Sequence, residues 1–194
     1  ISLILPALAA IAVLAHDSVS LLYGRTWLQA VPAVPWLCLA YAISSLFTLS
    51  APVLTGVGEP YAAIGPNALL VVAKVACAVW LMDGTLGTFA LAMALGQLLS
   101  VPYNLWIHAR YLNLGWATWA RSTIPVLAQA LLVGGVCLSI REALPVSLTP
   151  LAAILVTSCS ALVTFLASCF LLSLPMADEL KRMQKKLVRR RQKT

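Results

Sequence analysis

The residues that could do chemistry in this chain are few, and the first is a lysine inside a long apolar segment. Residues 61–82 read YAAIGPNALLVVAKVACAVWLM, with Lys74 near the middle. As a helix, this segment rises about 33 Å, which matches the hydrocarbon thickness of a bilayer. An ammonium group at that depth costs on the order of 2.5 to 3.5 kcal/mol on insertion scales, so we expect Lys74 to face protein or water rather than lipid.

Asn67 lies seven residues before Lys74, two helical turns away on the same side of the predicted helix. The two side chains therefore give this helix one polar face. A lysine in such a place can contact a substrate phosphate or respond to an ion. It can also pack against carbonyl groups or extend along the helix to the nearer interface. We predict that Lys74 and Asn67 bind substrate.

A second polar line follows a later apolar segment. Gln97, Ser100, Asn104 and His108 are spaced by three, four and four residues, as on one face of a helix. Such a line can wet a conduit or contact sugar hydroxyls, or it can join helices through hydrogen bonds worth about 0.6 kcal/mol each. Asn104 is close to Pro102, and a backbone broken by proline can open toward a cavity. We therefore add Asn104 and Gln97 to the predicted substrate-binding residues.

Other polar residues favour structural roles. Small polar side chains recur at helical spacing in two segments, which is typical of contacts between helices. The two stripes are Thr157, Ser160, Thr164 and Ser168, and Ser44, Thr48, Ala51 and Thr55. His16 and Asp17 are adjacent, so a helix points them to different faces. We interpret Asp17 as a carboxylate at the membrane interface, with binding of a coupling cation as the alternative.

The elements that must position these residues are membrane-spanning helices. Apolar residues make up 61% of the chain and charged residues 10%, a composition outside the range of soluble globular domains. We predict an all-α polytopic membrane helical bundle of about six transmembrane helices over residues 1–175. The apolar segments are approximately residues 1–22, 31–55, 61–82, 86–107, 124–140 and 148–174. The aromatic and basic stretch 108–121 is predicted to form an elbow at the headgroup level.

The positive charge is concentrated in the predicted tail, residues 176–194. Residues 178–194 contain eight basic and two acidic side chains and so carry +6 of the net charge of +7. Dense positive charge directly after a span indicates the cytoplasmic side. The basic residues also suit the anionic headgroups of membrane lipids. We therefore expect a cytoplasmic C-terminus and no binding to nucleic acid.

The sequence carries no signature of an enzyme. It has no Gly-rich nucleotide-binding loop, no G-x-S-x-G and no metal-spaced histidine cluster. Its five cysteines lie in apolar runs without a C-x-x-C spacing, which favours buried packing over disulfides or metal ligands. We expect no catalytic residue, no metal site and no cofactor.

Residues 20–60 carry a loose family pattern. The stretch SLLYGRTWLQAVPAVPWLCLAYAISSLFTLSAPVLTGVGEP has a span ending in LLYG, then Trp27, then Ala-Val-Pro opening the next span, then a Gly-x-Gly-x-Pro turn. This pattern resembles the C-terminal part of bacterial polysaccharide-biosynthesis membrane proteins. They are the O-antigen and exopolysaccharide flippases of the multidrug/oligosaccharidyl-lipid/polysaccharide exporter superfamily. The family often carries a basic residue where this chain has Glu59.

The resemblance implies the last six spans of a transporter with twelve to fourteen helices in two pseudo-symmetric bundles around a cavity. The N-terminal bundle of the same chain would be the partner of these spans. The implied substrate is an undecaprenyl-diphosphate-linked oligosaccharide, which crosses the bacterial inner membrane for synthesis of lipopolysaccharide or exopolysaccharide. Two alternatives remain open. A drug/cation antiporter of the same superfamily needs an intramembrane carboxylate, and a membrane-embedded glycosyltransferase or polymerase needs acidic or arginine residues in large extracytoplasmic loops.

Overall fold

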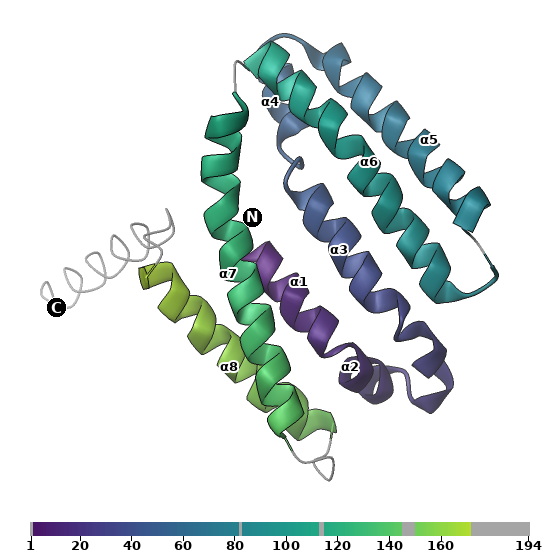
Figure 1. Ribbon diagram of the computed structural model, residues 1–194, viewed down its shortest axis with the longest axis vertical. Helices are drawn as coiled ribbons and strands as arrows, with labels where there is room; N and C mark the ends of the chain where they lie inside the picture. The colour runs from purple at the N-terminus through teal and green to yellow at the C-terminus, as the bar shows by residue number, and fades with distance from the viewer. Residues whose placement is uncertain (1, 82, 113–114, 145–149, 172–194) are drawn as a thin grey trace, which may run out of the picture.

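The computed structural model describes residues 2–81, 83–112, 115–144 and 150–171 (Figure 1). These ranges are helical and contain no strand, which confirms the predicted all-α fold. The predicted basic tail, residues 176–194, lies outside the described residues. In chain order the elements are α1 (Ile4–Val13), α2 (Ala15–Leu22), η1 (Arg25–Ala30), α3 (Ala33–Ser45), α4 (Ser50–Gly56), η2 (Pro60–Ala63), α5 (Ile64–Leu81), α6 (Leu86–Leu112), α7 (Trp116–Ala143) and α8 (Pro150–Leu171), where η marks a 3-10 helix.

Five stretches of the described chain are long and apolar enough to cross a membrane, and α1 with α2 would make a sixth as one bent span. The chain is therefore a multi-pass membrane protein. These stretches overlap the segments predicted from hydropathy, because length and continuous apolarity are visible in the sequence. The five are Ala33–Gly56, Pro60–Leu81, Leu86–Tyr111, Trp116–Ala143 and Leu151–Ser168.

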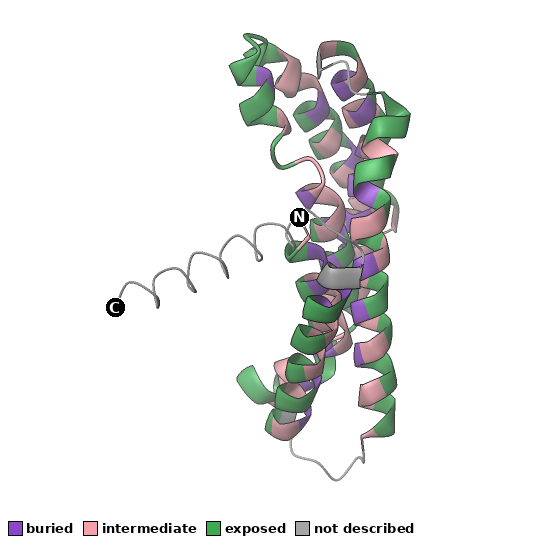
Figure 2. Cartoon of the chain, turned by 90° about the vertical axis from the view of Figure 1, so that its left-hand side faces the viewer, coloured by how far each residue is buried: buried purple, intermediate pink, exposed green. Residues whose placement is uncertain are grey.

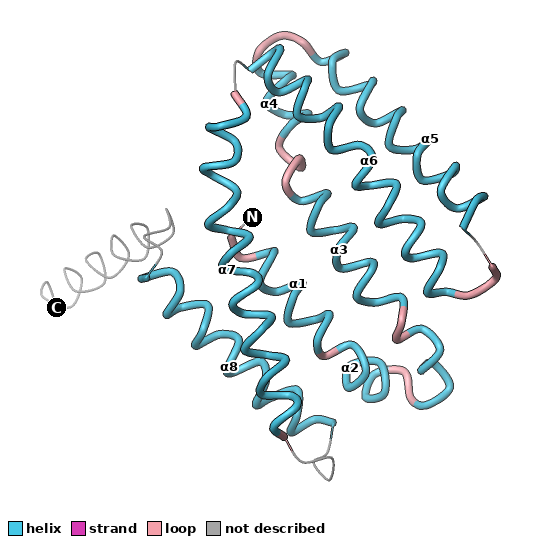
Figure 3. Tube along the Cα trace, viewed as in Figure 1, coloured by secondary structure: helices cyan, strands magenta, loops and turns pink. Residues whose placement is uncertain are grey.

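The helices lie side by side in the spatial order α5, α6, α3, α1, α7, α8 (Figures 1 and 3). Each inner helix packs mainly against one neighbour on either side, so much of its surface remains exposed, as the green areas of Figure 2 show. Many of the exposed side chains are large and apolar, among them Trp80, Leu131 and Val163. An apolar exterior is what a bilayer stabilises, since lipid tails solvate it without cost.

Helices α5 and α6 approach most closely at Gly96. A Cβ atom on Gly96 would lie 2.7 Å from the Cα atom of Lys74 and 2.8 Å from its backbone nitrogen. Any residue larger than glycine at this position would therefore displace α5. Small residues allow membrane helices to pack backbone to backbone. Ala92 and Ala94 of α6 are also buried. The contact fixes the register of α5 against α6, and with it the position of Lys74.

Two of the predicted spans are broken. The axis of α1 meets that of α2 at 74°, so the first segment does not run straight as its hydropathy suggested. The second segment is interrupted at residues 46–49, between α3 and α4, where backbone hydrogen bonds such as Phe47 N–H to Ser44 O span three residues. The interruption at residues 46–49 lies just before Pro52, which cannot donate a hydrogen bond to the Thr48 carbonyl, whereas no proline or glycine lies at the bend near Leu14.

The predicted elbow at residues 108–121 is wrong within the described residues. Helix α6 continues to Leu112 and α7 begins at Trp116. The aromatic and basic residues of this stretch are divided between the two helices: the Arg110 guanidinium of α6 lies over the Tyr111 ring, and Trp119 of α7 is stacked with Phe47. Side chains that suit a headgroup layer do not oppose helix formation, so composition was a poor guide to the backbone here.

A tight turn at Asp83 and Gly84 precedes α6. Gly84 takes a positive φ of 86°, and Asp83 accepts hydrogen bonds from the Thr85 backbone N–H at 3.1 Å and from the Thr88 hydroxyl. These bonds, with Thr88 contributing most, lower the pKa of the exposed Asp83 carboxyl below its ordinary value. The carboxylate thereby organises the first turn of α6.

Candidate functional site

A cavity of about 270 Å³ lies between the broken span α3–α4 and the pair α5–α6. The volume exceeds that of several water molecules at about 30 Å³ each and is just under that of the smallest typical ligand pockets, about 300 Å³. Of its thirteen lining residues, six carry an amide or a hydroxyl and none is ionisable. The lining consists of Ser44, Phe47, Thr48, Ser50, Ala51, Leu54, Ala63, Pro66, Asn67, Leu70, Gln97, Asn104 and Ile107.

Gln97 is the most informative residue of the cavity wall. Gln97 is only 4% exposed, and its side-chain amide makes no hydrogen bond to any described residue. A primary amide can form four hydrogen bonds, and burying it without them costs on the order of 1–3 kcal/mol. Since Gln97 lines the cavity, a polar molecule in the cavity can satisfy it. Water or a ligand therefore belongs at this position.

Neighbouring polar groups point to the same conclusion. Within the described chain, the side chain of Asn67 makes no hydrogen bond and the hydroxyl of Ser44 makes none. Asn104 donates from Nδ2 to the Ser100 carbonyl at 2.9 Å, which leaves its amide oxygen for the cavity. The cavity thus offers donors and acceptors but no net charge. Such a lining suits a neutral, hydroxyl-rich group better than an ion.

The structure brings together three of the four predicted substrate-binding residues. Asn67, Gln97 and Asn104 line one cavity. Lys74 does not line it. It lies one turn beyond Leu70 on α5, beside Gly96, is partly buried and makes no hydrogen bond or ion pair with any described residue. Lys74 is therefore next to the cavity, at the end marked by Gln97.

The polar line on α6 divides into residues with different partners. The Ser100 hydroxyl donates to the Gln97 carbonyl of its own helix at 2.7 Å, whereas His108 Nε2 lies 2.6 Å from the Ser50 hydroxyl of α4. Spacing alone could not separate these roles, because it fixes the face of a helix and not what packs on that face.

The polar stripe of the second span differs from its prediction. We expected Ser44, Thr48, Ala51 and Thr55 to join helices, but the first three line the cavity. The hydroxyls of Thr48 and Thr55 donate to carbonyls within their own span. Ser50, a further lining residue, was missed altogether. Ser50 is the first residue of α4, between the interruption at residues 46–49 and Pro52, and the spacing of the stripe did not include it.

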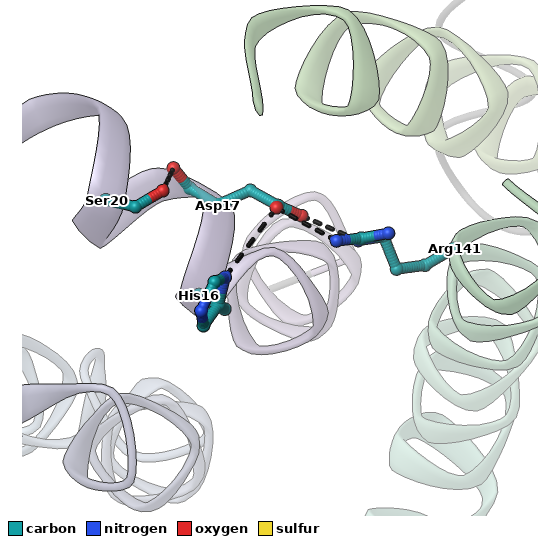
Figure 4. Close-up of polar contacts among 4 residues, drawn as sticks. All are labelled: His16, Asp17, Ser20 and Arg141. Carbon is teal, nitrogen blue, oxygen red and sulfur yellow. Dashed lines mark hydrogen bonds and ion pairs between the residues drawn. The ribbon is translucent and has the colours of Figure 1, made fainter. Parts of the chain in front are cut away.

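A second polar cluster lies at the other side of the layer and is fully paired (Figure 4). Asp17 is only 4% exposed. Arg141 of α7 donates to both of its oxygens, from Nε at 2.7 Å and from a terminal nitrogen at 3.0 Å. His16 Nδ1 is 3.8 Å from the same carboxylate, beyond hydrogen-bond distance. Asp17 is therefore a buried partner of Arg141, a pairing that the sequence did not predict.

A third polar cluster joins α7 to α8. Gln129 is fully buried and donates from Nε2 to the Ser168 hydroxyl at 3.0 Å. This confirms helix contact for Ser168 of the predicted stripe, while Ser160 and Thr164 donate to carbonyls of their own helix. Gln129 was missed from sequence, although a lone glutamine in a long apolar run is itself a signal for an interhelical hydrogen bond.

No known protein family, no curated protein and no solved structure matches this chain. The family pattern of residues 20–60 thus remains a prediction. No group of three or more histidine, cysteine, aspartate or glutamate side chains gathers as a metal site within the described ranges.

Proposed function

We propose that this chain forms part of a transporter that moves a lipid-linked oligosaccharide, an undecaprenyl-diphosphate glycan, across the bacterial inner membrane. The single observation that supports it most is the unpaired amide of Gln97 on the wall of a neutral cavity among membrane-spanning helices. Sugar hydroxyls both donate and accept hydrogen bonds, so amides and hydroxyls recognise them without burying a charge. The pattern of residues 20–60 supports the same class.

In this proposal the sugar occupies the cavity and the diphosphate lies toward Lys74. Lys74 is on α5 beside Gly96, and Gln97 is the next residue of α6. An ammonium group there attracts the phosphate oxygens, while the neutral lining holds the uncharged sugar. The break between α3 and α4 supplies backbone that can rearrange beside the ligand, as in transporters that bind substrate at broken helices. The C-terminus faces the cytoplasm.

The two alternatives gain no specific support. A drug/cation antiporter needs an accessible carboxylate in its binding cavity, whereas the carboxylate of Asp17 is paired with Arg141 and does not line the cavity. A glycosyltransferase or polymerase needs an acid or base near its substrate, and no cavity-lining residue carries a carboxylate. A transporter of a lipid-linked oligosaccharide accounts for the neutral lining directly, because sugar hydroxyls bind to amides and hydroxyls.

Two buried glutamines provide a matched test. Gln97→Leu removes the unpaired amide of the cavity, and Gln129→Leu removes an amide that is bonded to Ser168. Each full-length variant is expressed in cells that lack the native copy. The amount of lipid-linked glycan reaching the outer face of the inner membrane is measured by surface labelling and divided by protein abundance.

We expect Gln97→Leu to lower export per molecule by roughly tenfold, the equivalent of about 1.4 kcal/mol of binding, at normal abundance. Gln129→Leu should lower abundance and keep export per molecule. Normal export by an abundant Gln97→Leu protein would remove the cavity from the transport path.

Lys74→Ala should abolish export without loss of protein, with partial recovery in Lys74→Arg. Normal export in Lys74→Ala would exclude Lys74 from the proposed site and would leave the proposal for the cavity unchanged.

A further inference from the structure

The wall of the cavity contains one hydrogen bond to a titratable side chain. The Ser50 hydroxyl lines the cavity and lies 2.6 Å from Nε2 of His108. His108 is on α6 behind this wall and is itself only 8% exposed. The Phe47 ring is tilted against the imidazole, with centroids 5.6 Å apart, and is itself stacked with the Trp119 ring. The imidazole is therefore held against Ser50 and has little freedom to turn away.

A serine hydroxyl has a single proton, so the state of His108 decides where that proton points. When Nε2 carries no proton, it accepts a hydrogen bond from Ser50, and the serine presents only acceptor lone pairs to the cavity. When the imidazole is protonated, Nε2 must donate to the Ser50 oxygen. The hydroxyl proton of Ser50 is then no longer bonded to His108, and the hydroxyl can donate a hydrogen bond to a molecule in the cavity.

We propose that His108 is a positioning residue that sets, by its protonation state, whether Ser50 offers a hydrogen-bond donor to the cavity. This inference rests on the proposed function, because the donor matters only if the cavity binds a ligand. The ligand group that gains from it is an oxygen acceptor of the glycan. Protonation of His108 and binding of that acceptor therefore favour each other.

The surroundings of His108 supply no other charge that would control it. Ser50 comes from α4 and Phe47 from residues 46–49, and both are neutral. No described carboxylate forms an ion pair with His108, and Arg110 on the same helix lies over Trp106 and Tyr111 instead. The other cationic residues on elements that pack near α6 are Arg121 of α7, Lys74 of α5, which lies beside Gly96, and Arg25 of η1, an element close to the opposite end of α6.

Nuclear magnetic resonance of the imidazole nitrogens tests the inference directly. This chain has two histidines, and the signals of His108 are identified as those that disappear in His108→Gln. The full-length protein, labelled with 15N at histidine, is placed in lipid nanodiscs and titrated. We expect the neutral form to carry its proton on Nδ1, with Nε2 accepting from Ser50, and to become protonated as the pH is lowered. In Ser50→Ala the preference for this tautomer should be lost.

A binding measurement on the same samples tests the consequence for the cavity. The probe is a water-soluble prenyl-diphosphate disaccharide. Its affinity should rise roughly fivefold as pH falls through the measured His108 titration, a typical size for coupling between two sites. Ser50→Ala and His108→Gln should both bind the probe without that pH dependence. Ser50→Ala removes only one oxygen, so loss of the fold does not explain its result.

The outcomes separate the inference from the proposed function. A neutral His108 with its proton on Nε2, or a pH dependence of binding that survives in Ser50→Ala, overturns the inference. A wild-type protein that shows the expected tautomer and titration but binds no probe at any pH supports the role of His108. That result contradicts the glycan as ligand.

Discussion

The cavity at α3–α6 and the ion pair at the α2–α7 contact are both buried polar regions, but they differ in how completely they are paired. At the ion pair, Arg141 donates two hydrogen bonds to Asp17. In the cavity, the equally buried amide of Gln97 has no partner among the described residues. The first region has the geometry of a structural ion pair, and the second has hydrogen-bonding groups that a ligand could use.

The difference shows why polarity inside a membrane protein is not by itself evidence of function. Removing a paired group exposes its partner to an apolar environment, so the fold loses stability. Removing an unpaired group relieves a desolvation cost, so the fold loses little and only ligand binding suffers. Stability and transport should therefore respond in opposite ways in the two regions. Four substitutions test this contrast, each read from the free energy of unfolding in detergent micelles.

The largest effect is expected for Arg141→Leu. It leaves the Asp17 carboxylate buried at 4% exposure without a partner. Breaking a buried pair in this way costs 3–5 kcal/mol, and we expect about 3 kcal/mol because the Arg141 side chain is itself 33% exposed. The control is the double variant Asp17→Asn with Arg141→Gln, which removes both charges and should lose less. A loss below about 1 kcal/mol in Arg141→Leu, typical of an exposed pair, would contradict a structural role of this ion pair.

Gly96→Ala should have the next largest effect. The new Cβ would lie 2.7 Å from the Lys74 Cα atom, so α5 and α6 must move apart. Overpacking of this kind costs about 1–3 kcal/mol. Gly135→Ala is the matched control, because a Cβ at Gly135 of α7 has nothing within 4 Å, and alanine favours a helix over glycine by about 1 kcal/mol. Equal effects of the two substitutions would show that α5 is not seated on Gly96.

Gln129→Leu should cost less, because it removes hydrogen bonds of a neutral amide to α8, among them those to the Ser168 hydroxyl and to the Phe165 carbonyl. Its amide donates to Ser168 at 3.0 Å, and such bonds contribute about 0.6 kcal/mol on average in membrane helices, with a maximum near 1.7. The double-mutant cycle with Ser168→Ala measures the coupling between the two side chains. A coupling energy of zero would mean that the bond between Gln129 and Ser168 contributes nothing to the contact of α7 with α8.

Gln97→Leu should have the smallest effect on stability and is the decisive comparison with Gln129→Leu. The amide of Gln97 has no protein partner to lose, and an apolar side chain of similar size removes its desolvation cost. The free energy of unfolding should stay unchanged or rise slightly. A loss as large as that of Gln129→Leu would show that the cavity amide is bonded to the protein and is structural.

Part of the candidate site was predictable because helical spacing is local. Asn67 follows the start of a span, and Gln97 and Asn104 are seven residues apart on another, so each shares a helix face with other polar residues. Their meeting in one cavity depended on α5 packing against α6, which Gly96 permits. Lys74 shared the same pattern, yet the packing leaves it outside the lining. Spacing predicts which side of a helix is polar but not where the neighbouring helix leaves space.

The sequence by itself determined that this is a multi-pass, all-α membrane protein and approximately where its helices run. Those features depend on length and apolarity along the chain, because the hydrocarbon core rewards every apolar residue independently. Only the tertiary structure decided the bend at Leu14, the pairing of Asp17 with Arg141 across 124 positions, and the exposure of Ser50 to the cavity. Each of these depends on which helices become neighbours. That choice is made by close packing between distant segments, for which a single sequence carries no local signal.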